Sequence, residues 1–146
     1  MRLLVSACLL GLCCRYDGGS KPCQAVIDLR DQHQLIPVCP EQLGGLPTPR
    51  PPAEIQPDGR VVNRQGQDVT AAYRKGAEEA LRLFRALRCD AALLKARSPS
   101  CGCAQVYDGA FTGTLIPGQG IAAKCLMDEG IPVWSEENLP FILFTF

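Results

Sequence analysis

Cysteine is the residue type in this sequence with the greatest capacity for chemistry. The 146-residue chain contains nine cysteines. Because the number is odd, they cannot all pair in internal disulfides, and disulfide-stabilised domains are usually shorter and richer in loops. We therefore expect reduced thiols, a cytoplasmic location and a metal site. The nine are Cys8, Cys13, Cys14, Cys23, Cys39, Cys89, Cys101, Cys103 and Cys125.

Three of these cysteines, Cys8, Cys39 and Cys101, come after short apolar runs of the kind that form buried strands. In open parallel sheets, ligands bind beyond the carboxyl ends of the strands. We therefore expect the three thiols to meet at one edge of a sheet. Neither the close Cys-x-x-Cys pairs of structural zinc sites nor the usual ferredoxin spacings occur here, so spacing alone leaves an iron–sulfur cluster and zinc both open.

The other cysteines have different expected roles. A free cysteine is most often a small buried hydrophobe, and we expect this of Cys23, Cys89 and Cys125. Cys13 and Cys14 are adjacent, which is poor geometry for two ligands of one compact site. Cys103 either joins Cys101 as a ligand or lines the binding pocket.

The elements that must position these thiols alternate between strand and helix. Apolar runs predict the strands, and spacing of apolar residues by three and four predicts the helices. The expected strands are 2–7, 35–38, 91–96 and 131–134, and the expected helices are 22–33, 69–88 and 118–129. Prolines and glycines predict a loop over 40–52, and Asp58-Gly59 predicts the turn of a hairpin.

This order predicts an α/β fold: a single-domain, Rossmann-like parallel sheet of about four strands with helices on both faces, plus a small β-hairpin insertion. We expect residues 1–146 to form one domain whose apolar tail packs on the body. Few apolar residues precede Cys8, so we do not expect a lipoprotein signal there, and we expect the apolar end at 139–146 to be too short to span a bilayer.

The charge balance restricts the partners. Lys plus Arg and Asp plus Glu number 15 each, so the formal net charge is zero. The field of the whole protein therefore does not attract nucleic acid or an anionic membrane. We expect a small-molecule substrate, no stable nucleic-acid partner and no membrane association, and the oligomeric state stays open.

Four ordered motifs give the chain a family resemblance. They are Ser6-Ala7-Cys8-Leu9-Leu10-Gly11; Cys14-Arg15-Tyr16-Asp17-Gly18-Gly19; Val38-Cys39-Pro40-Glu41 with Gly44-Gly45-Leu46 and Pro49-Arg50; and Lys95-Ala96-Arg97-Ser98-Pro99-Ser100-Cys101-Gly102. Together they resemble the thiouracil desulfidase (TudS-like) family, formerly a bacterial domain of unknown function. The resemblance covers nearly the whole chain.

The resemblance implies a [4Fe-4S] cluster held by only three protein ligands, Cys8, Cys39 and Cys101. It implies desulfuration of thiouracil (4-thiouracil, 2-thiouracil or both), or of thiolated nucleotides, to the uracil compound and hydrogen sulfide without net redox change. An iron that lacks a protein ligand can act as a Lewis acid and bind the substrate sulfur.

Residues beside the ligands are candidates for proton transfer. Glu41 is two residues from Cys39, and we expect it to act as a general acid/base. The alternative is a solvated carboxylate at a loop or helix start. Ser100 adjoins Cys101, and its hydroxyl is expected to position water or the base. The alternative is a turn hydroxyl bonded to its own backbone.

Substrate contacts are expected from the first loop. Arg15, Tyr16 and Asp17 can hydrogen-bond to a uracil ring or stack on it, and Cys103 can line the pocket. Asp17 can equally belong to a simple turn. Arg50 either binds a phosphate or holds its loop by an ion pair.

Two other functions remain open. One is a redox or binding module with a structural Fe–S or zinc site. The other is an enzyme that inserts sulfur, which would need an activated nucleotide or a sulfur donor, but the chain has no Gly-x-x-x-x-Gly-Lys motif to hold phosphates.

Overall fold

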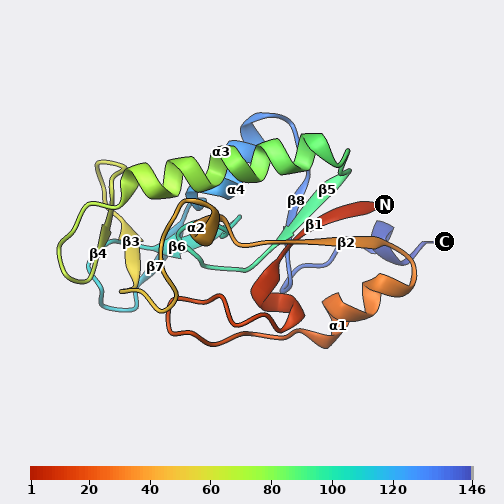
Figure 1. Cartoon of the computed structure of the whole chain (residues 1–146), viewed down its shortest axis with the longest axis horizontal. Helices are drawn as coiled ribbons and strands as arrows, with labels where there is room; N and C mark the ends of the chain where they lie inside the picture. Colours follow the sequence, from red (N-terminus) through yellow and green to blue (C-terminus); the bar gives the residue numbers. More distant parts are fainter. Residues whose placement is uncertain (146) are drawn as a thin grey trace.

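Four parallel strands form the central sheet of this protein, whose computed structural model describes residues 1–145. The strands are β1 (Arg2–Ser6), β2 (Gln34–Val38), β5 (Ala91–Leu94) and β8 (Val133–Ser135). Their order across the sheet is β2-β1-β5-β8, and each neighbouring pair is parallel. The α/β fold with a four-stranded parallel sheet is therefore confirmed (Figure 1).

Helices cover both faces of this sheet. They are η1 (Ala7–Leu10), α1 (Gln24–Ile27), η2 (Asp28–Asp31), α2 (Pro40–Leu43), α3 (Thr70–Ala86), α4 (Ile121–Asp128) and η3 (Phe141–Phe144), the η elements being 3-10 helices. Successive side chains of a strand point to opposite faces. Leu3 and Val5 of β1 therefore pack with α1 and η2, whereas Leu4 packs with α3 and α4. Figure 1 shows α1 on one side of the strands and α3 with α4 on the other.

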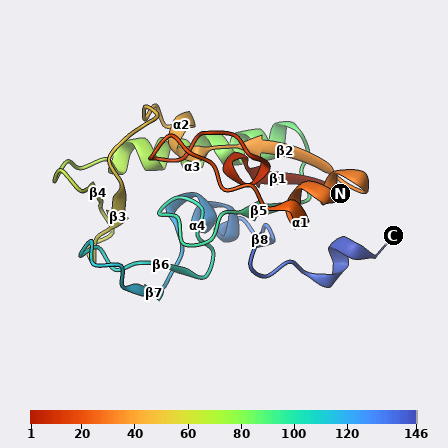
Figure 2. The same ribbon diagram turned by 90° about the horizontal axis from the view of Figure 1, so that it is seen from below.

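Two small antiparallel hairpins lie outside the sheet. The expected one pairs β3 (Ala53–Ile55) with β4 (Val61–Asn63). A second hairpin pairs β6 (Gln105–Tyr107) with β7 (Leu115–Pro117) and was not anticipated, because its strands are only three residues long and carry no clear alternation. The two hairpins contact each other through β3 and β6, and they lie together at the end of the molecule farthest from the N-terminus (Figures 1 and 2).

Several expected boundaries were wrong. The helix expected over 22–33 is two short segments, α1 and η2. The loop expected over 40–52 begins with helix α2, because a proline at the first helical position already has a helical φ and lacks an N–H that would be unpaired there. The last helix begins at Ile121 and not at Gly118, since Gly120 before it is the N-cap and has an extended backbone with a ψ of 161°. In the described residues, no helix is long and apolar enough to cross a membrane.

Helix α2 packs very closely on α3. Gly44 follows α2 and Gly76 lies within α3; a Cβ on Gly44 would overlap the carbonyl of Ala72, and one on Gly76 would overlap the carbonyl of Pro40. Only glycine fits at these two positions. The close contact fixes α2, and with it Glu41 in its first turn, against the longest helix of the fold.

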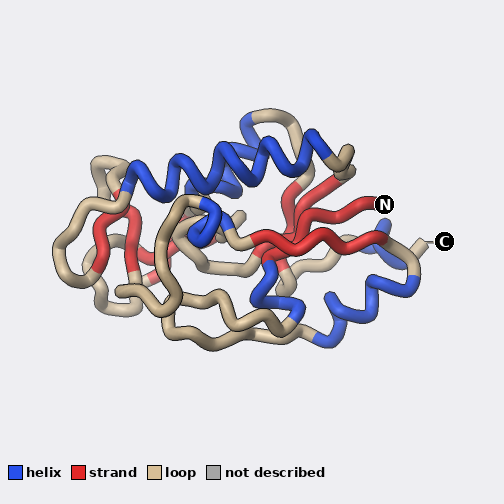
Figure 3. Tube along the Cα trace, viewed as in Figure 1, coloured by secondary structure: helices blue, strands red, loops and turns tan. Residues whose placement is uncertain are grey.

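The tail packs on the body, as expected. Leu143 in η3 is fully buried in the apolar cluster below the sheet, on the side that carries α1. Loops join the sheet to the hairpins, and Figure 3 shows these loops between the two groups of strands. This loop region contains the site described next.

Candidate active site

A cavity of about 650 Å³ lies where strands β1, β2 and β5 end, and the two hairpins form its other walls. Cys8, Cys39 and Cys101 all line it. Cys8 lies in η1 immediately after β1, Cys39 is the N-cap of α2 immediately after β2, and Cys101 lies in the turn that follows β5. The structure thus brings three cysteines from distant parts of the sequence to one cavity.

The turn that carries Cys101 is built by local hydrogen bonds. The hydroxyl Oγ of Ser98 accepts from the backbone N–H groups of Ser100 and Cys101, at 3.1 and 3.0 Å. Gly120, the N-cap of α4, packs on this turn so closely that a Cβ would lie 2.5 Å from the carbonyl carbon of Ser100. The position of Cys101 is therefore set both by its own turn and by the start of α4.

The chemistry of these thiols fits an iron–sulfur cluster. All nine cysteines are unpaired, and burial raises the pKa of Cys101 to about 12 and also raises the pKa of Cys8. Both are therefore protonated thiols at neutral pH until a metal displaces their protons. Within residues 1–145, no group of three or more candidate ligands is close enough to hold a single metal ion. A lone zinc needs sulfur ligands at about 2.3 Å, whereas a cluster spreads its thiolates over a larger body. Three cysteine thiols that line one cavity are the kind of donor set that an iron–sulfur cluster takes.

Glu41 is the centre of a hydrogen-bond network in this cavity. Its Oε1 accepts from Arg50 Nε at 2.9 Å and from the hydroxyl of Tyr73 at 2.8 Å. Its Oε2 accepts from Ser100 Oγ at 3.1 Å. Ser100 Oγ also lies 3.5 Å from Cys101 Sγ. The Glu41 side chain is only 13% exposed, which rules out the solvated carboxylate considered above. The network places a carboxylate and a hydroxyl beside one of the three cysteines.

Arg50 ties this network to the first loop of the chain. Besides its ion pair with Glu41, Arg50 donates from Nη2 to the carbonyl of Cys14 at 2.9 Å and from Nη1 to that of Pro47 at 3.2 Å. The Arg50 side chain is 4% exposed. Of the two roles considered for it, the structure shows the ion pair that holds loops together.

Of the three substrate-contact candidates in the first loop, two line the cavity and one does not. Arg15 and Tyr16 line the cavity, and the Arg15 guanidinium lies 5.5 Å from the centre of the Tyr16 ring. Asp17 instead accepts from Gly19 N at 2.9 Å, which is the turn alternative, and it is not among the cavity-lining residues of the described chain. Cys103 is not among them either, because it packs against the apolar cluster on the α3–α4 side of the sheet.

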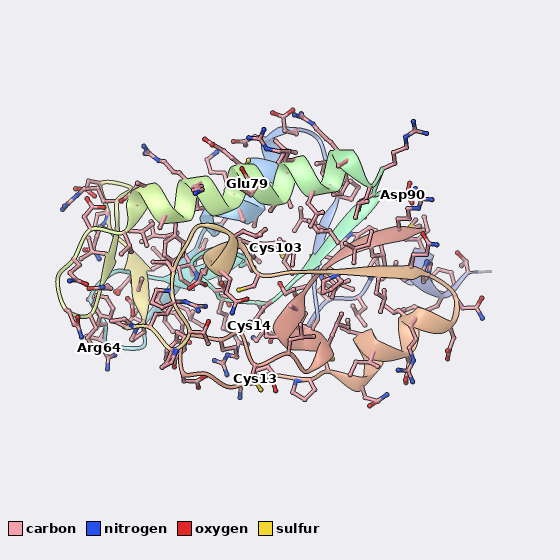
Figure 4. The ribbon with its side chains drawn as sticks, viewed as in Figure 1. Cys13, Cys14, Arg64, Glu79, Asp90 and Cys103 are labelled. Carbon is pink, nitrogen blue, oxygen red and sulfur yellow. The ribbon has the colours of Figure 1, made fainter. Side chains whose placement is uncertain are left out.

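Sequence reasoning missed one thiol at the end of the cavity that Cys8, Cys39 and Cys101 line, which we call the cysteine end. Cys13 is exposed, but Cys14 is buried and lines the cavity (Figure 4). Its carbonyl lies 3.7 Å from Cys39 Sγ, and burial raises the pKa of its thiol to about 12. Cys14 N donates to the carbonyl of Leu12 at 2.9 Å, so the chain turns at Cys13 and the two adjacent thiols lie in different surroundings. No signal in the sequence pointed to this tight turn.

The hairpins contribute further cavity residues, among them Glu54, Arg64 and Phe111. Glu54 follows Ala53 in β3, Arg64 follows β4, and Phe111 lies in the turn between β6 and β7. No signal in the sequence pointed to Phe111, because the second hairpin itself was not expected.

The cavity is positively charged although the protein is neutral overall. Six cationic side chains and two carboxylates line it. Three of the cations are paired with carboxylates: Arg50 with Glu41, Lys95 with Glu136 and Arg97 with Glu137. The others are Arg15, Lys21 and Arg64, and none of them forms a salt bridge within residues 1–145. The unbalanced charge suits a substrate with an anionic group.

Comparison with known proteins gives consistent relatives. The family model described as 2-thiouracil desulfurase matches residues 3–138. An uncharacterized protein of Bacillus subtilis (strain 168), YbbK, is 39% identical over 150 residues, which cover 97% of this chain and 99% of that protein.

A solved structure has the same fold. It is that of a [4Fe-4S]-dependent thiouracil desulfidase, TudS (DUF523Vcz), which superimposes with a TM-score of 0.90 at 46% sequence identity. The match covers 98% of this chain and 95% of that one. The resemblance seen in the four sequence motifs is therefore confirmed, and the chain belongs to the 2-thiouracil desulfurase family.

Proposed function

We propose that this chain is a [4Fe-4S]-dependent thiouracil desulfidase, which converts thiouracil and water to uracil and hydrogen sulfide without net oxidation or reduction. The observation that carries the proposal is the meeting of Cys8, Cys39 and Cys101 in one cavity with the hydrogen-bonded pair of Glu41 and Ser100. Family membership and the likeness to a thiouracil desulfidase of known structure support it.

In this proposal Cys8, Cys39 and Cys101 hold the cluster. Three protein ligands leave one iron open, and the bound cluster supplies a Lewis acid toward the thiocarbonyl sulfur. Cys14 shares this end of the cavity but is assigned no ligand role.

In this proposal Glu41 transfers the proton of the attacking water, and Ser100 orients the groups involved. Arg50 and Tyr73 occupy Oε1 of Glu41, so Oε2 is the oxygen left to Ser100 and to a reacting water. We assign Glu41 Oε2 as the base that takes a proton as water attacks the ring carbon, and later as the acid that returns it to the departing sulfur. Ser100 Oγ orients the water and the carboxylate.

We further propose that the substrates include a thiolated uridine nucleotide as well as the free base. Arg15, Lys21 and Arg64 have no carboxylate partner among the described residues, and they supply charge that a neutral pyrimidine does not need and a phosphate does. Tyr16, beside Cys14 in the first loop, offers a ring face on which the pyrimidine can stack.

We propose a cytoplasmic location, because nine unpaired cysteines suit a reducing compartment. We also propose that residues 1–146 work as one desulfidase domain without a stable nucleic-acid partner, since the net charge is zero. A redox or binding module is disfavoured, because such a module needs neither the Glu41–Ser100 pair nor a cavity of about 650 Å³.

Anaerobic reconstitution tests the proposal. The protein is loaded with iron and sulfide, and in parallel with zinc as the matched control. We expect about four irons and four sulfides per chain, and sulfide release from thiouracil by the iron form alone. The assay uses 2-thiouracil, 4-thiouracil and 4-thiouridine monophosphate. Stoichiometric zinc binding with no uptake of iron, or a full cluster without sulfide release from any of the three, would contradict the proposal.

A further inference from the structure

Phe111 has an unusual backbone conformation at the wall of the cavity. Its φ is 58°, in the left-handed region that bulky side chains rarely adopt. Such a conformation persists only where surrounding contacts hold it, and it is concentrated at functional sites. Phe111 lines the cavity, so the strained residue is also one that a substrate can meet.

Two residues of the other hairpin hold this conformation. Glu54 Oε1 accepts from the backbone N–H groups of Gly109 and Phe111, at 3.0 and 3.1 Å. Gln56 Nε2 donates to the carbonyl of Gly109 at 3.2 Å. Glu54 is 9% exposed, so these charge-assisted bonds are protected from water. Gly109 itself has a φ of 98°, and a Cβ there would lie 2.9 Å from the carbonyl oxygen of Ile55. These contacts restrict the turn between β6 and β7 to one backbone conformation.

The held ring is paired with a cation. The guanidinium of Arg64 lies 5.6 Å from the centre of the Phe111 ring, and both residues line the cavity. Arg64 has no carboxylate partner within residues 1–145. Figure 4 shows Arg64 at the hairpin end of the molecule and Cys14 near the middle, so this pair and the cysteines belong to different ends of the site.

We infer that Phe111 and Arg64 form a specificity subsite for the part of the substrate beyond the pyrimidine, and that Glu54 is the positioning residue that holds Phe111 in it. The inference rests on the proposed function, which places the reacting sulfur at the cysteines. The Phe111 ring packs on the ribose of a nucleotide, and Arg64 pairs with its phosphate. Free thiouracil has no group that reaches this subsite.

Steady-state kinetics of the reconstituted holoenzyme test the subsite, with 4-thiouracil and 4-thiouridine monophosphate as paired substrates. For Phe111→Gly we expect the KM of the nucleotide to rise about tenfold, as for loss of one buried apolar contact. The KM of the free base and both kcat values stay unchanged. Glycine adopts a φ of 58° without strain, so the melting temperature should not fall by more than a few degrees.

Arg88→Gly is the matched control. Arg88 also has a positive φ, 51°, but it lies just after α3 and outside the cavity. Its replacement relieves the same kind of backbone strain and should leave both KM values unchanged. Phe111→Tyr, which keeps the ring, should keep the KM of the nucleotide within about twofold of the original.

Glu54 is tested by a conservative rescue. Glu54→Gln keeps an oxygen that accepts both N–H groups, and the KM of the nucleotide should change by less than about threefold. Glu54→Ala removes the acceptor and should raise that KM about as much as Phe111→Gly does. Arg64→Ala should raise the KM of the nucleotide alone, independently of how the turn folds.

Three possible results would each contradict either the subsite or the proposed function. A nucleotide KM that is unchanged in Phe111→Gly and Arg64→Ala overturns the subsite, as does an equal rise for base and nucleotide, which would indicate general support of the site. An original enzyme that acts on thiouracil but not on the nucleotide overturns the subsite and leaves the desulfidase function standing. A fully loaded protein inactive on both contradicts the desulfidase function itself.

Discussion

The two ends of the cavity are built in different ways. At the cysteine end, Cys8, Cys39 and Cys101 each follow a strand of the parallel sheet, and two of those strands, β1 and β5, are almost completely buried. At the hairpin end, Glu54 and Phe111 belong to two small antiparallel sheets that meet outside the main core. The first end is fixed by the hydrophobic core, and the second by a few buried hydrogen bonds.

This difference separates chemistry from specificity. Groups that must be held accurately lie on elements that cannot shift without disturbing the core. The hairpins contribute no strand to the main sheet, so their residues can change what the cavity admits without altering the position of the cysteines. Substitutions at the cysteine end should therefore affect every substrate, and those at the hairpin end only substrates long enough to reach it.

The largest effect is expected from the ligand cysteines. We expect the cluster to be lost in each of three variants, Cys8→Ala, Cys39→Ala and Cys101→Ala, because the two remaining thiolates cannot hold it. Without the cluster, turnover of both the base and the nucleotide should be lost. Iron content after anaerobic reconstitution measures this. Cys103→Ala is the matched control. Cys103 packs among apolar side chains on the α3–α4 side of the sheet, so the variant protein should keep its full iron content. A full cluster in Cys39→Ala would show that the ligand assignment is wrong.

The cysteine end was largely predictable because strand signals and motifs coincide there. Apolar runs located β1, β2 and β5, and the rule that parallel strands end at one edge placed the thiols together. Tyr73 lies within the helix expected over 69–88, but its hydrogen bond to Glu41 depends on the close packing of α2 on α3. No periodicity in the sequence encodes such a tertiary contact.

The hairpin end was predictable only in part. Asp58-Gly59 located the first hairpin, because that dipeptide has a strong turn preference. The strands of the second are three residues long, too short for alternation to stand out. The left-handed φ of Phe111 runs against its own preference and is imposed by Glu54 from another part of the chain. A residue forced by tertiary contacts cannot be found from local propensity.

A smaller loss is expected at Glu41. Glu41→Gln keeps the size of the side chain and one oxygen that can accept, but its second oxygen becomes an NH2 group and the carboxylate base is lost. We expect kcat to fall about a hundredfold or more for both substrates, with iron content unchanged, because loss of a general base costs that order of rate. Single-turnover sulfide release measures the chemical step.

The control for Glu41 is Tyr73→Phe. It removes one of the two hydrogen bonds to Glu41 Oε1 but keeps the carboxylate and the buried ring, so its kcat should fall by much less. Loss of iron in Glu41→Gln would make Glu41 a support of the cluster site, and an unchanged kcat would remove it from the chemistry. Either result would contradict the assignment of the proton-transfer step to Glu41 at the cysteine end.

The smallest effect is expected at Cys14, and it tests how many thiols the cysteine end uses. Cys14 is buried there beside Cys39, but the contact that Arg50 makes with it is to its backbone carbonyl, which any residue provides. With three ligands, Cys14→Ser should retain about four irons and nearly full turnover. Cys13→Ser, at the exposed neighbour, should behave identically. Loss of iron in Cys14→Ser alone would make the site a closed set of four ligands. Such a site suits electron transfer or structure, and it would leave no open iron for the substrate sulfur.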